Sequence, residues 1–286
     1  MNRREMLKGA AFGAVALAVS PRTLAMQARG VAARLAALEQ RHGGRLGIAI
    51  LDTGNGARAA WRGDERFLMC STFKLLLVAA VLKRVEGGQE KLDRRVVFGK
   101  DVLLEYAPVT RLHVGPPGMT VAQLCEAAIT LSDNTAANLL LATIARPSGV
   151  THYARTLGDT LTRLDHIEPF LNRPNSEDDT TTPWAMLGDM QKLLLGDALS
   201  QGSRDLLTRW LTANKTGADS LRAGLPADWR EADKTGSGHT ANNDIAILWP
   251  PNRKPLIVTS YYDNAKVEVA ARKAVLAEVG RIVATM

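Results

Sequence analysis

Aromatic residues, cysteines and long apolar runs are all scarce in this sequence. Phe, Trp and Tyr together make up 5% of the chain, and only two cysteines occur. After the first 25 residues, no apolar run approaches the roughly 18 residues that a transmembrane helix needs. No block of about five or more basic residues occurs, so the formal charge of +7 lacks the clustering typical of nucleic-acid binding. We therefore expect neither a membrane span in the mature protein nor a nucleic-acid partner.

Ligands for metal ions are equally sparse. The five histidines include no His-x-His and no pair at i, i+4 spacing, and no carboxylate stands beside them at ligand spacing. We therefore expect no metal and no other cofactor. Cys70 and Cys125 could form a disulfide in an oxidising compartment, depending on where the fold places them.

The composition that remains is that of a soluble globular protein. Hydrophobic residues make up 46% and charged residues 23% of the 286 positions, which excludes a disordered or collagen-like chain. A chain of this length buries roughly 70–75% of its unfolded surface, enough for a deep site that excludes water.

The first 25 residues are typical of an export signal. A basic start is followed by an apolar run over 9–19 and by small residues near Ala25. The Arg3-Arg4 pair followed by Met-Leu-Lys at 6–8 resembles a twin-arginine signal, which carries folded proteins across the bacterial inner membrane. The alternative is an amphipathic first helix. A removable leader with four basic residues and one acidic residue carries a net charge of +3, which leaves +4 for a periplasmic mature protein.

Hydrophobic periodicity predicts an α+β protein whose sheet is assembled from both ends of the chain. The expected order is one helix, two strands, a helical block, three strands and a last helix. We therefore expect an α/β subdomain made of 26–63 and 214–286 and an all-helical subdomain over 64–213. The predicted strands are 45–52, 57–62, 229–236, 244–249 and 255–262, and the predicted helices are 27–41, 73–85, 121–131, 135–144, 183–195, 203–211 and 265–286.

A serine and a lysine three residues apart stand where the helix over 73–85 begins. Residues at this spacing share a helix face, so Ser71 and Lys74 can touch, and a desolvated lysine can serve as a base. Cys70 is rotated by about 100° from Ser71, which weakens a thiol nucleophile. The Ser71 N–H lies in the first helical turn, where it can stabilise an oxyanion. Alone, this pattern more often marks a helix cap followed by a solvated lysine.

Two further tripeptides change that interpretation. Ser-Asp-Asn at 132–134 begins a helix, and Lys-Thr-Gly at 234–236 lies on a late strand. The three motifs in this order are typical of class A serine β-lactamases and penicillin-binding proteins. Between them, Glu-Pro-Phe-Leu-Asn at 168–172 resembles the class A Ω-loop, here 163–179. From about Ala32 to its end, the chain is therefore similar to class A β-lactamases.

This resemblance implies a fold and a reaction. The fold is an antiparallel five-stranded sheet flanked by N- and C-terminal helices, with an inserted all-helical subdomain. The reaction is hydrolysis of the β-lactam amide through an acyl-enzyme on Ser71, with Lys74 and Glu168 as candidate acylation bases and Ser132 as the proton relay. Glu168 activates the water for deacylation. The expected partners are small-molecule β-lactam antibiotics, and the chain is expected to be a monomer.

The resemblance also implies the substrate contacts. The N–H groups of Ser71 and Ser237 form the oxyanion hole, and Glu168 with Asn172 positions the hydrolytic water. The substrate-binding residues are Asn134, Asn172, Lys234, Thr235, Gly236, Ser237 and Tyr106.

Two alternatives remain within the same superfamily. One is a D,D-peptidase acting on peptidoglycan, and the other is a β-lactam sensor that is acylated without turnover. Sensors of that kind carry a membrane anchor and lack the Glu-Asn pair, so the leader together with Glu168 and Asn172 favours the hydrolase.

The sequence departs from the family at the carboxylate pocket. Many relatives carry an arginine there, but this chain has Ser220 at one of the usual positions and no arginine over 239–244 at the other. The stretch from 234 to 244 is also about two residues shorter than in relatives that end it with the same Asn-Asp pair. We predict weaker ground-state binding of the substrate carboxylate, seen as a raised KM, and lower sensitivity to clavulanate.

Other departures concern the Ω-loop and the partners of the two cysteines. The Ω-loop is two residues short between 172 and 179, and His166 replaces the arginine that usually faces Asp179. The usual partners of the two cysteines are replaced by Gly238 and Val78, so both thiols should be free and buried. We also expect a cis bond at 168–169, a structural role for Asp133 and an ion pair between Arg222 and Asp233.

Overall fold

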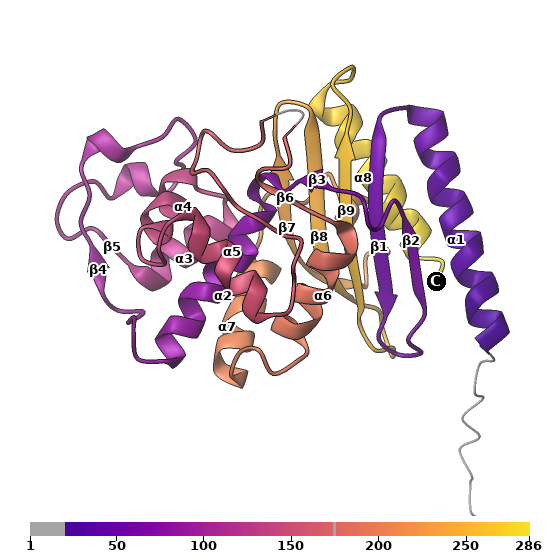
Figure 1. The fold of residues 1–286 in the computed structure, drawn as a ribbon, viewed down its shortest axis with the longest axis horizontal. Coiled ribbons are helices and arrows are strands. Elements are labelled where there is room, and N and C mark those ends of the chain that lie inside the picture. The colour runs from indigo at the N-terminus through magenta and orange to yellow at the C-terminus, as the bar shows by residue number, and fades with distance from the viewer. Residues whose placement is uncertain (1–20, 174–175) are drawn as a thin grey trace, which may run out of the picture.

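The protein consists of a sheet layer and a helical layer that lie side by side (Figure 1). The structure is a computed structural model that describes residues 21–173 and 176–286. Its main sheet has five strands in the order β2-β1-β9-β8-β7, and every neighbouring pair is antiparallel. The strands come from both ends of the chain, which confirms the predicted fold class. Their bounds are β1 Arg45–Asp52, β2 Arg58–Trp61, β7 Arg230–Ser237, β8 Ala241–Trp249 and β9 Leu256–Asp263.

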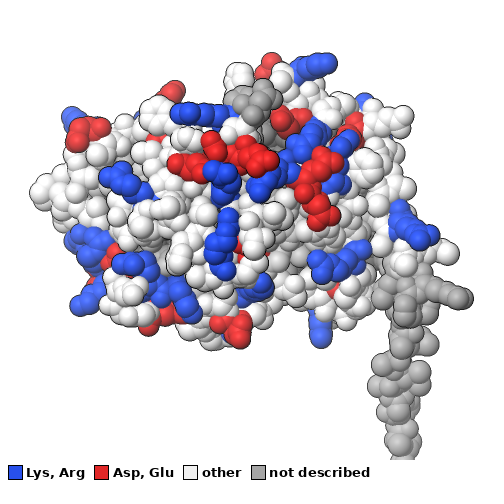
Figure 2. Space-filling model, in the orientation of Figure 1, with Lys and Arg blue, Asp and Glu red and all other residues white. Residues whose placement is uncertain are grey.

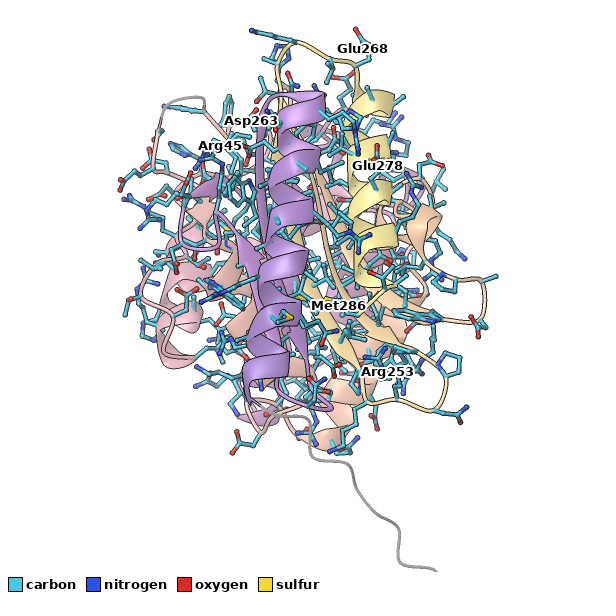
Figure 3. The ribbon with its side chains drawn as sticks, turned by 90° about the vertical axis from the view of Figure 1, so that its right-hand side faces the viewer. Arg45, Arg253, Asp263, Glu268, Glu278 and Met286 are labelled. Atoms are coloured by element: carbon cyan, nitrogen blue, oxygen red, sulfur yellow. The ribbon has the colours of Figure 1, made fainter. Side chains whose placement is uncertain are left out.

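The N- and C-terminal helices cover one face of the sheet. Helix α1 (Pro21–His42) and helix α8 (Val269–Val283) run side by side, and Glu278 of α8 lies close to α1 (Figure 3). His42 Nε2 lies 2.8 Å from Glu278 Oε1, which ties the two helices together. Apolar side chains of both helices and the sheet form one buried cluster, which includes Leu35, Ile48, Val258 and Leu276.

The helical block covers the other face of the sheet. Its central helix α2 buries every residue from Phe73 to Leu82, because apolar neighbours surround it on all sides. Against the sheet, Thr259 Oγ1 of β9 donates to the Pro183 carbonyl of α6 over 2.8 Å. The block contains α2 Phe73–Glu86, α3 Val121–Thr130, α4 Asn134–Leu141, α5 Pro147–Thr156, α6 Pro183–Leu194 and α7 Gln201–Thr212.

Several short elements have no counterpart among the predicted ones. Helix α5 begins with Pro, Ser and Gly at 147–149, which are typical of a turn, and two-residue strands carry no periodicity at all. Strand β3 (Phe67–Leu68) pairs with β6 (Thr180–Thr181), and β4 (Arg95–Val96) pairs with β5 (Met119–Thr120). The 3-10 turns are η1 Cys70–Thr72, η2 Lys100–Val102, η3 Thr110–Leu112 and η4 Leu221–Gly224.

The two ends of the chain differ from expectation in extent. Residues 1–20 of the predicted export signal lie outside the described residues, and helix α1 already begins at Pro21 rather than at Gln27. Helix α8 spans Val269–Val283, shorter at both ends than the predicted 265–286. In the described part of the chain, no helix combines the length and apolarity needed to cross a membrane. On the face drawn in Figure 2, Lys and Arg side chains lie among Asp and Glu side chains.

Candidate active site

Ser71 is presented by a strained turn between the two layers. It lies in η1, directly before α2, and the preceding Cys70 has a positive φ of 47°, which costs energy for a residue with a side chain. Strand β7 passes close behind the turn: a Cβ added at Gly236 would lie 3.2 Å from the Ser71 nitrogen and 2.8 Å from the Met69 carbonyl oxygen. Glycine at 236 therefore lets the strand reach the nucleophile, as an active-site strand edge must.

The hydroxyl of Ser132 lies between two buried lysines. Lys74 Nζ is 3.3 Å and Lys234 Nζ is 3.1 Å from Ser132 Oγ. Lys74 also donates to the Ser132 carbonyl over 2.8 Å and to Asn134 Oδ1 over 2.6 Å, and its Nζ is 3.6 Å from Glu168 Oε1. The three sequence motifs and the Ω-loop carboxylate thus meet at one point.

Both lysines have depressed pKa values because they are fully buried. Burial lowers the pKa of Lys74 to about 8, although the charges of Glu168 and Asp133 act to raise it. Burial and the neighbouring Lys74 lower the pKa of Lys234 to about 7, against the opposing effect of nearby carboxylates. For Lys74, the candidate base, the neutral amine is therefore accessible near neutral pH, as a lysine base requires.

The Ω-loop places Glu168 at the cleft through its backbone. The Glu168–Pro169 bond is cis, as predicted. Asn138 of α4 holds Glu168 on both sides, because its Nδ2 donates to the Glu168 carbonyl over 2.9 Å and its Oδ1 accepts from the Glu168 N–H over 3.1 Å. Further along the loop, Asn172 Oδ1 accepts from the Cys70 N–H over 2.8 Å. The loop is thereby tied to the turn that carries Ser71.

Asp179 closes the Ω-loop from inside. This fully buried carboxylate accepts from the N–H groups of Asp165, His166 and Asn172. The His166 ring nitrogen Nδ1 lies 2.8 Å from Asp179 Oδ2, which confirms the predicted pairing. The Asp179 carbonyl accepts from the Met69 N–H over 2.9 Å, so the end of the loop also contacts the nucleophile turn.

A pair of buried carboxyl groups lies at the neck of the same loop. Asp159 Oδ1 accepts from the N–H groups of Leu161 and Thr162, which lead into the loop. Asp189 of α6 is 1% exposed, and burial together with the charge and hydrogen bond of Asp159 raises its pKa to about 9. The Oδ2 atoms of both residues have no hydrogen-bond partner among the described residues. A protonated Asp189 beside Asp159 avoids placing two negative charges next to each other in the interior.

The wall opposite the Ω-loop carries hydroxyl groups and lysines. Thr235 Oγ1 is hydrogen-bonded to Thr216 Oγ1, and Ser237 Oγ accepts from Asn242 Nδ2 over 2.9 Å. Lys215 and Lys273 also line the cleft, and among the described lining residues these are the cations, with no arginine. Sequence reasoning missed both lysines and Asn138, because none of them belongs to a motif and only the fold brings them here.

The predicted site residues converge on a cavity of about 460 Å³. The described structure buries Lys74 and Lys234 behind this cavity and places Gly236 against the Ser71 turn. Tyr106 is 50% exposed at the rim. The predicted residues that line the cavity are Ser71, Tyr106, Ser132, Asn134, Glu168, Asn172, Thr235 and Ser237.

The remaining expectations have mixed outcomes. Cys70 and Cys125 are free and buried, as predicted, and burial raises the pKa of Cys70 to about 12. The predicted pair of Arg222 with Asp233 is wrong. Arg222 Nε lies 2.7 Å from Glu231 Oε2, one strand period earlier, while Asp233 accepts from an asparagine amide.

Asp133 has a structural role in the helical layer. Asp133 caps α4 by accepting from Ala136, and it also accepts from the backbone N–H groups of Val109 and Thr110 and from the Thr110 hydroxyl. These bonds fit the predicted structural role. Within residues 21–173 and 176–286, no three His, Cys, Asp or Glu side chains are grouped to hold a metal ion.

Comparison with known proteins places the chain in one family. The model of the "Beta-lactamase enzyme family" matches residues 30–285. Beta-lactamase CTX-M-25 of Escherichia coli is 45% identical over 284 residues, covering 98% of this chain and 97% of that protein. Beta-lactamase OXY-1 of Klebsiella oxytoca is 43% identical, covering 96% and 94% of the two chains. Among solved structures, an ancestral class A β-lactamase is 59% identical with a TM-score of 0.87, covering 89% of this chain and 99% of that chain. The chain therefore belongs to the class A β-lactamase family.

Proposed function

We propose that this protein hydrolyses the amide bond of β-lactam antibiotics through an acyl-enzyme on Ser71. The observation that carries the proposal is that Ser71, Ser132 and Glu168 line one cavity. The Ser132 hydroxyl lies between two lysines, and the Nζ atom of one of them, Lys74, is next to the Glu168 carboxylate. Family membership supports the same reaction.

In the acylation step, Ser71 Oγ attacks the lactam carbonyl carbon and gives its proton to Lys74 or Glu168. The N–H groups of Ser71 and Ser237 stabilise the oxyanion, each typically by about 3 kcal/mol in the transition state. The carbon–nitrogen bond then breaks, and Ser132 protonates the leaving nitrogen while it takes up the proton removed from Ser71 through Lys74, whose Nζ lies 3.3 Å from Ser132 Oγ. Lys234, at 3.1 Å from Ser132 Oγ, keeps the potential positive there.

In the deacylation step, Glu168 takes a proton from a water that Asn172 helps to position. The resulting hydroxide attacks the ester carbonyl, the bond to Ser71 breaks, and Ser71 leaves with the proton that Glu168 took from the water. Asn138 supports this role because it fixes the backbone of Glu168 on both sides. Asn134, Thr235, Gly236 and Tyr106 complete the substrate site, with Asn134 and the Ser237 carbonyl binding the side-chain amide of the drug and the hydroxyl groups binding its carboxylate.

Turnover of nitrocefin tests the proposal. We expect many turnovers per enzyme, whereas one equivalent followed by arrest would favour a D,D-peptidase or a sensor. In the Glu168→Ala variant, mass spectrometry should find the acyl group on Ser71, because Lys74 remains as a base for acylation while hydrolysis of the ester stops. An unmodified Ser71 would refute its role as nucleophile, and Ser71→Ala serves as the control that cannot be acylated.

We also propose export through the twin-arginine pathway, followed by removal of residues 1–25. The remaining chain would act in the periplasm as a monomer built from the 26–63 and 214–286 subdomain and the inserted 64–213 subdomain. Changing Arg3 and Arg4 together to lysine should retain the protein in the cytoplasm, and unchanged export would contradict the pathway.

A further inference from the structure

A buried arginine reaches the substrate cleft through one asparagine. Arg272 of α8 is 4% exposed and Asn242 of β8 is 2% exposed. Arg272 Nε donates to Asn242 Oδ1 over 2.7 Å, and Asn242 Nδ2 donates to Ser237 Oγ over 2.9 Å. Asn242 and Ser237 are also direct partners in the β7–β8 register. The three side chains thus connect helix α8, which lies next to α1 in Figure 3, to the cleft that Ser237 lines.

The chemistry of arginine fixes the direction of these hydrogen bonds. A guanidinium group has donors and no acceptor, so the Asn242 atom facing Arg272 must be the amide oxygen. The atom facing Ser237 is then the NH₂ group, which can only donate. Ser237 Oγ therefore accepts from Asn242, and the hydroxyl hydrogen of Ser237 is left to point away from Asn242, toward the cleft that Ser237 lines.

Arg272 itself is held so that it cannot turn away. Its Nη1 donates to the backbone carbonyls of Asn264 and Val267 over 3.1 and 2.8 Å. Among the described residues, no carboxylate lies within 4 Å to form an ion pair with it. Its charge therefore polarises the Asn242 amide and strengthens the donation toward Ser237.

We propose that Asn242 is a positioning residue that fixes the Ser237 hydroxyl as a hydrogen-bond donor to the carboxylate of the substrate. This inference rests on the proposed function. It assigns part of the carboxylate recognition to a neutral relay backed by buried Arg272, because no arginine is among the described residues that line the cleft. The relay selects substrates that present an anionic group beside Ser237.

The Asn242→Asp variant tests the direction of the bond, since it changes one polar group without changing shape. The new carboxylate accepts from Arg272 and also from the Ser237 hydroxyl, which then turns its lone pairs toward the cleft. For a penicillin with a free carboxylate, kcat/KM should fall by about 10- to 100-fold, the typical worth of a hydrogen bond to a charged group. The fall should lie in KM. The methyl ester of the same penicillin should change by about twofold or less.

Two controls separate the hydroxyl from other effects. In a Ser237→Ala background, the additional effect of Asn242→Asp should shrink to about twofold, because no hydroxyl remains to be turned. His239→Asp places the same charge on the exposed β7–β8 turn and should leave the discrimination between acid and ester unchanged. If Asn242→Asp does not fold, Asn242→Ala replaces it and should cost the free acid several-fold more than the ester.

The outcomes distinguish the relay from the proposed function. Equal losses for acid and ester, or an undiminished loss in the Ser237→Ala background, would overturn the relay while wild-type hydrolysis stands. No hydrolysis of either compound by the wild-type protein would refute the proposed function itself.

Discussion

Replacing Asp189 with Asn should raise the free energy of unfolding at neutral pH. The folded protein holds this carboxyl protonated against Asp159, because burial raises its pKa from 3.8 to about 9. In the unfolded chain at pH 7 the same group is ionised, so folding must take up a proton. At about 1.4 kcal/mol per pKa unit, the interval from the ordinary value to pH 7 costs at most about 4 kcal/mol. Asparagine has no proton to take up, and its NH₂ group can still donate to Asp159.

The sign of this effect gives the assay. A carboxyl whose pKa is raised in the folded state contributes most to the free energy of unfolding below its unfolded pKa of 3.8. It loses that contribution as the pH rises to about 9. In urea unfolding between about pH 5 and pH 8, the free energy of unfolding of the variant should therefore rise relative to that of the wild type by about 1.4 kcal/mol per pH unit. Asp228→Asn, at an exposed position, is the control and should gain nothing. Parallel curves for Asp189→Asn and the wild type would refute the reasoning.

Three further predictions concern the cleft and its loop. Lys234→Arg should move the alkaline limb of the kcat/KM profile for anionic substrates to higher pH. Lys234, with a pKa of about 7, loses its charge as the pH rises through that value, whereas a guanidinium stays charged. Coincident pH profiles would contradict this. Lys273→Gln should raise KM for the same substrates about two- to fivefold with kcat little changed, since a lining cation is lost; steady-state kinetics that show an unchanged KM would argue against a role for this charge. His166→Ala should lower the free energy of unfolding by about 1–3 kcal/mol, because buried Asp179 loses a partner. Urea unfolding measures that loss, which His166→Gln should partly restore.

Much of the fold could be predicted because burial leaves a periodic trace. Strand β1 alternates apolar side chains and α2 is apolar all round, so both were predicted within a few residues of their observed bounds. The two-residue β3–β6 ladder is too short to show any periodicity, and helix α5 begins with residues typical of a turn, Pro147, Ser148 and Gly149. Their positions depend on the tertiary fold rather than on local preference, which is why the sequence alone did not indicate them.

The site divides in the same way. Residues inside motifs, such as Ser71 and Lys234, could be predicted because the chemistry requires their types in a fixed order. Asn138 and Arg272 act on the site from other elements, and no spacing rule connects them to a motif. The error over Arg222 has a related cause. Residues two apart on a strand face the same side, so the sequence could not decide which of two acids it meets.

The hydrogen bonds from the Ω-loop to the nucleophile turn have an evolutionary consequence. Asn172 and Asp179 each accept from the backbone just before Ser71, at Cys70 and Met69. A substitution that loosens the loop to admit a bulkier drug also loosens the turn that presents the serine. Broader resistance in descendants of this enzyme should therefore arise in pairs of mutations, one that widens the cleft and one that restores the rigidity of the turn.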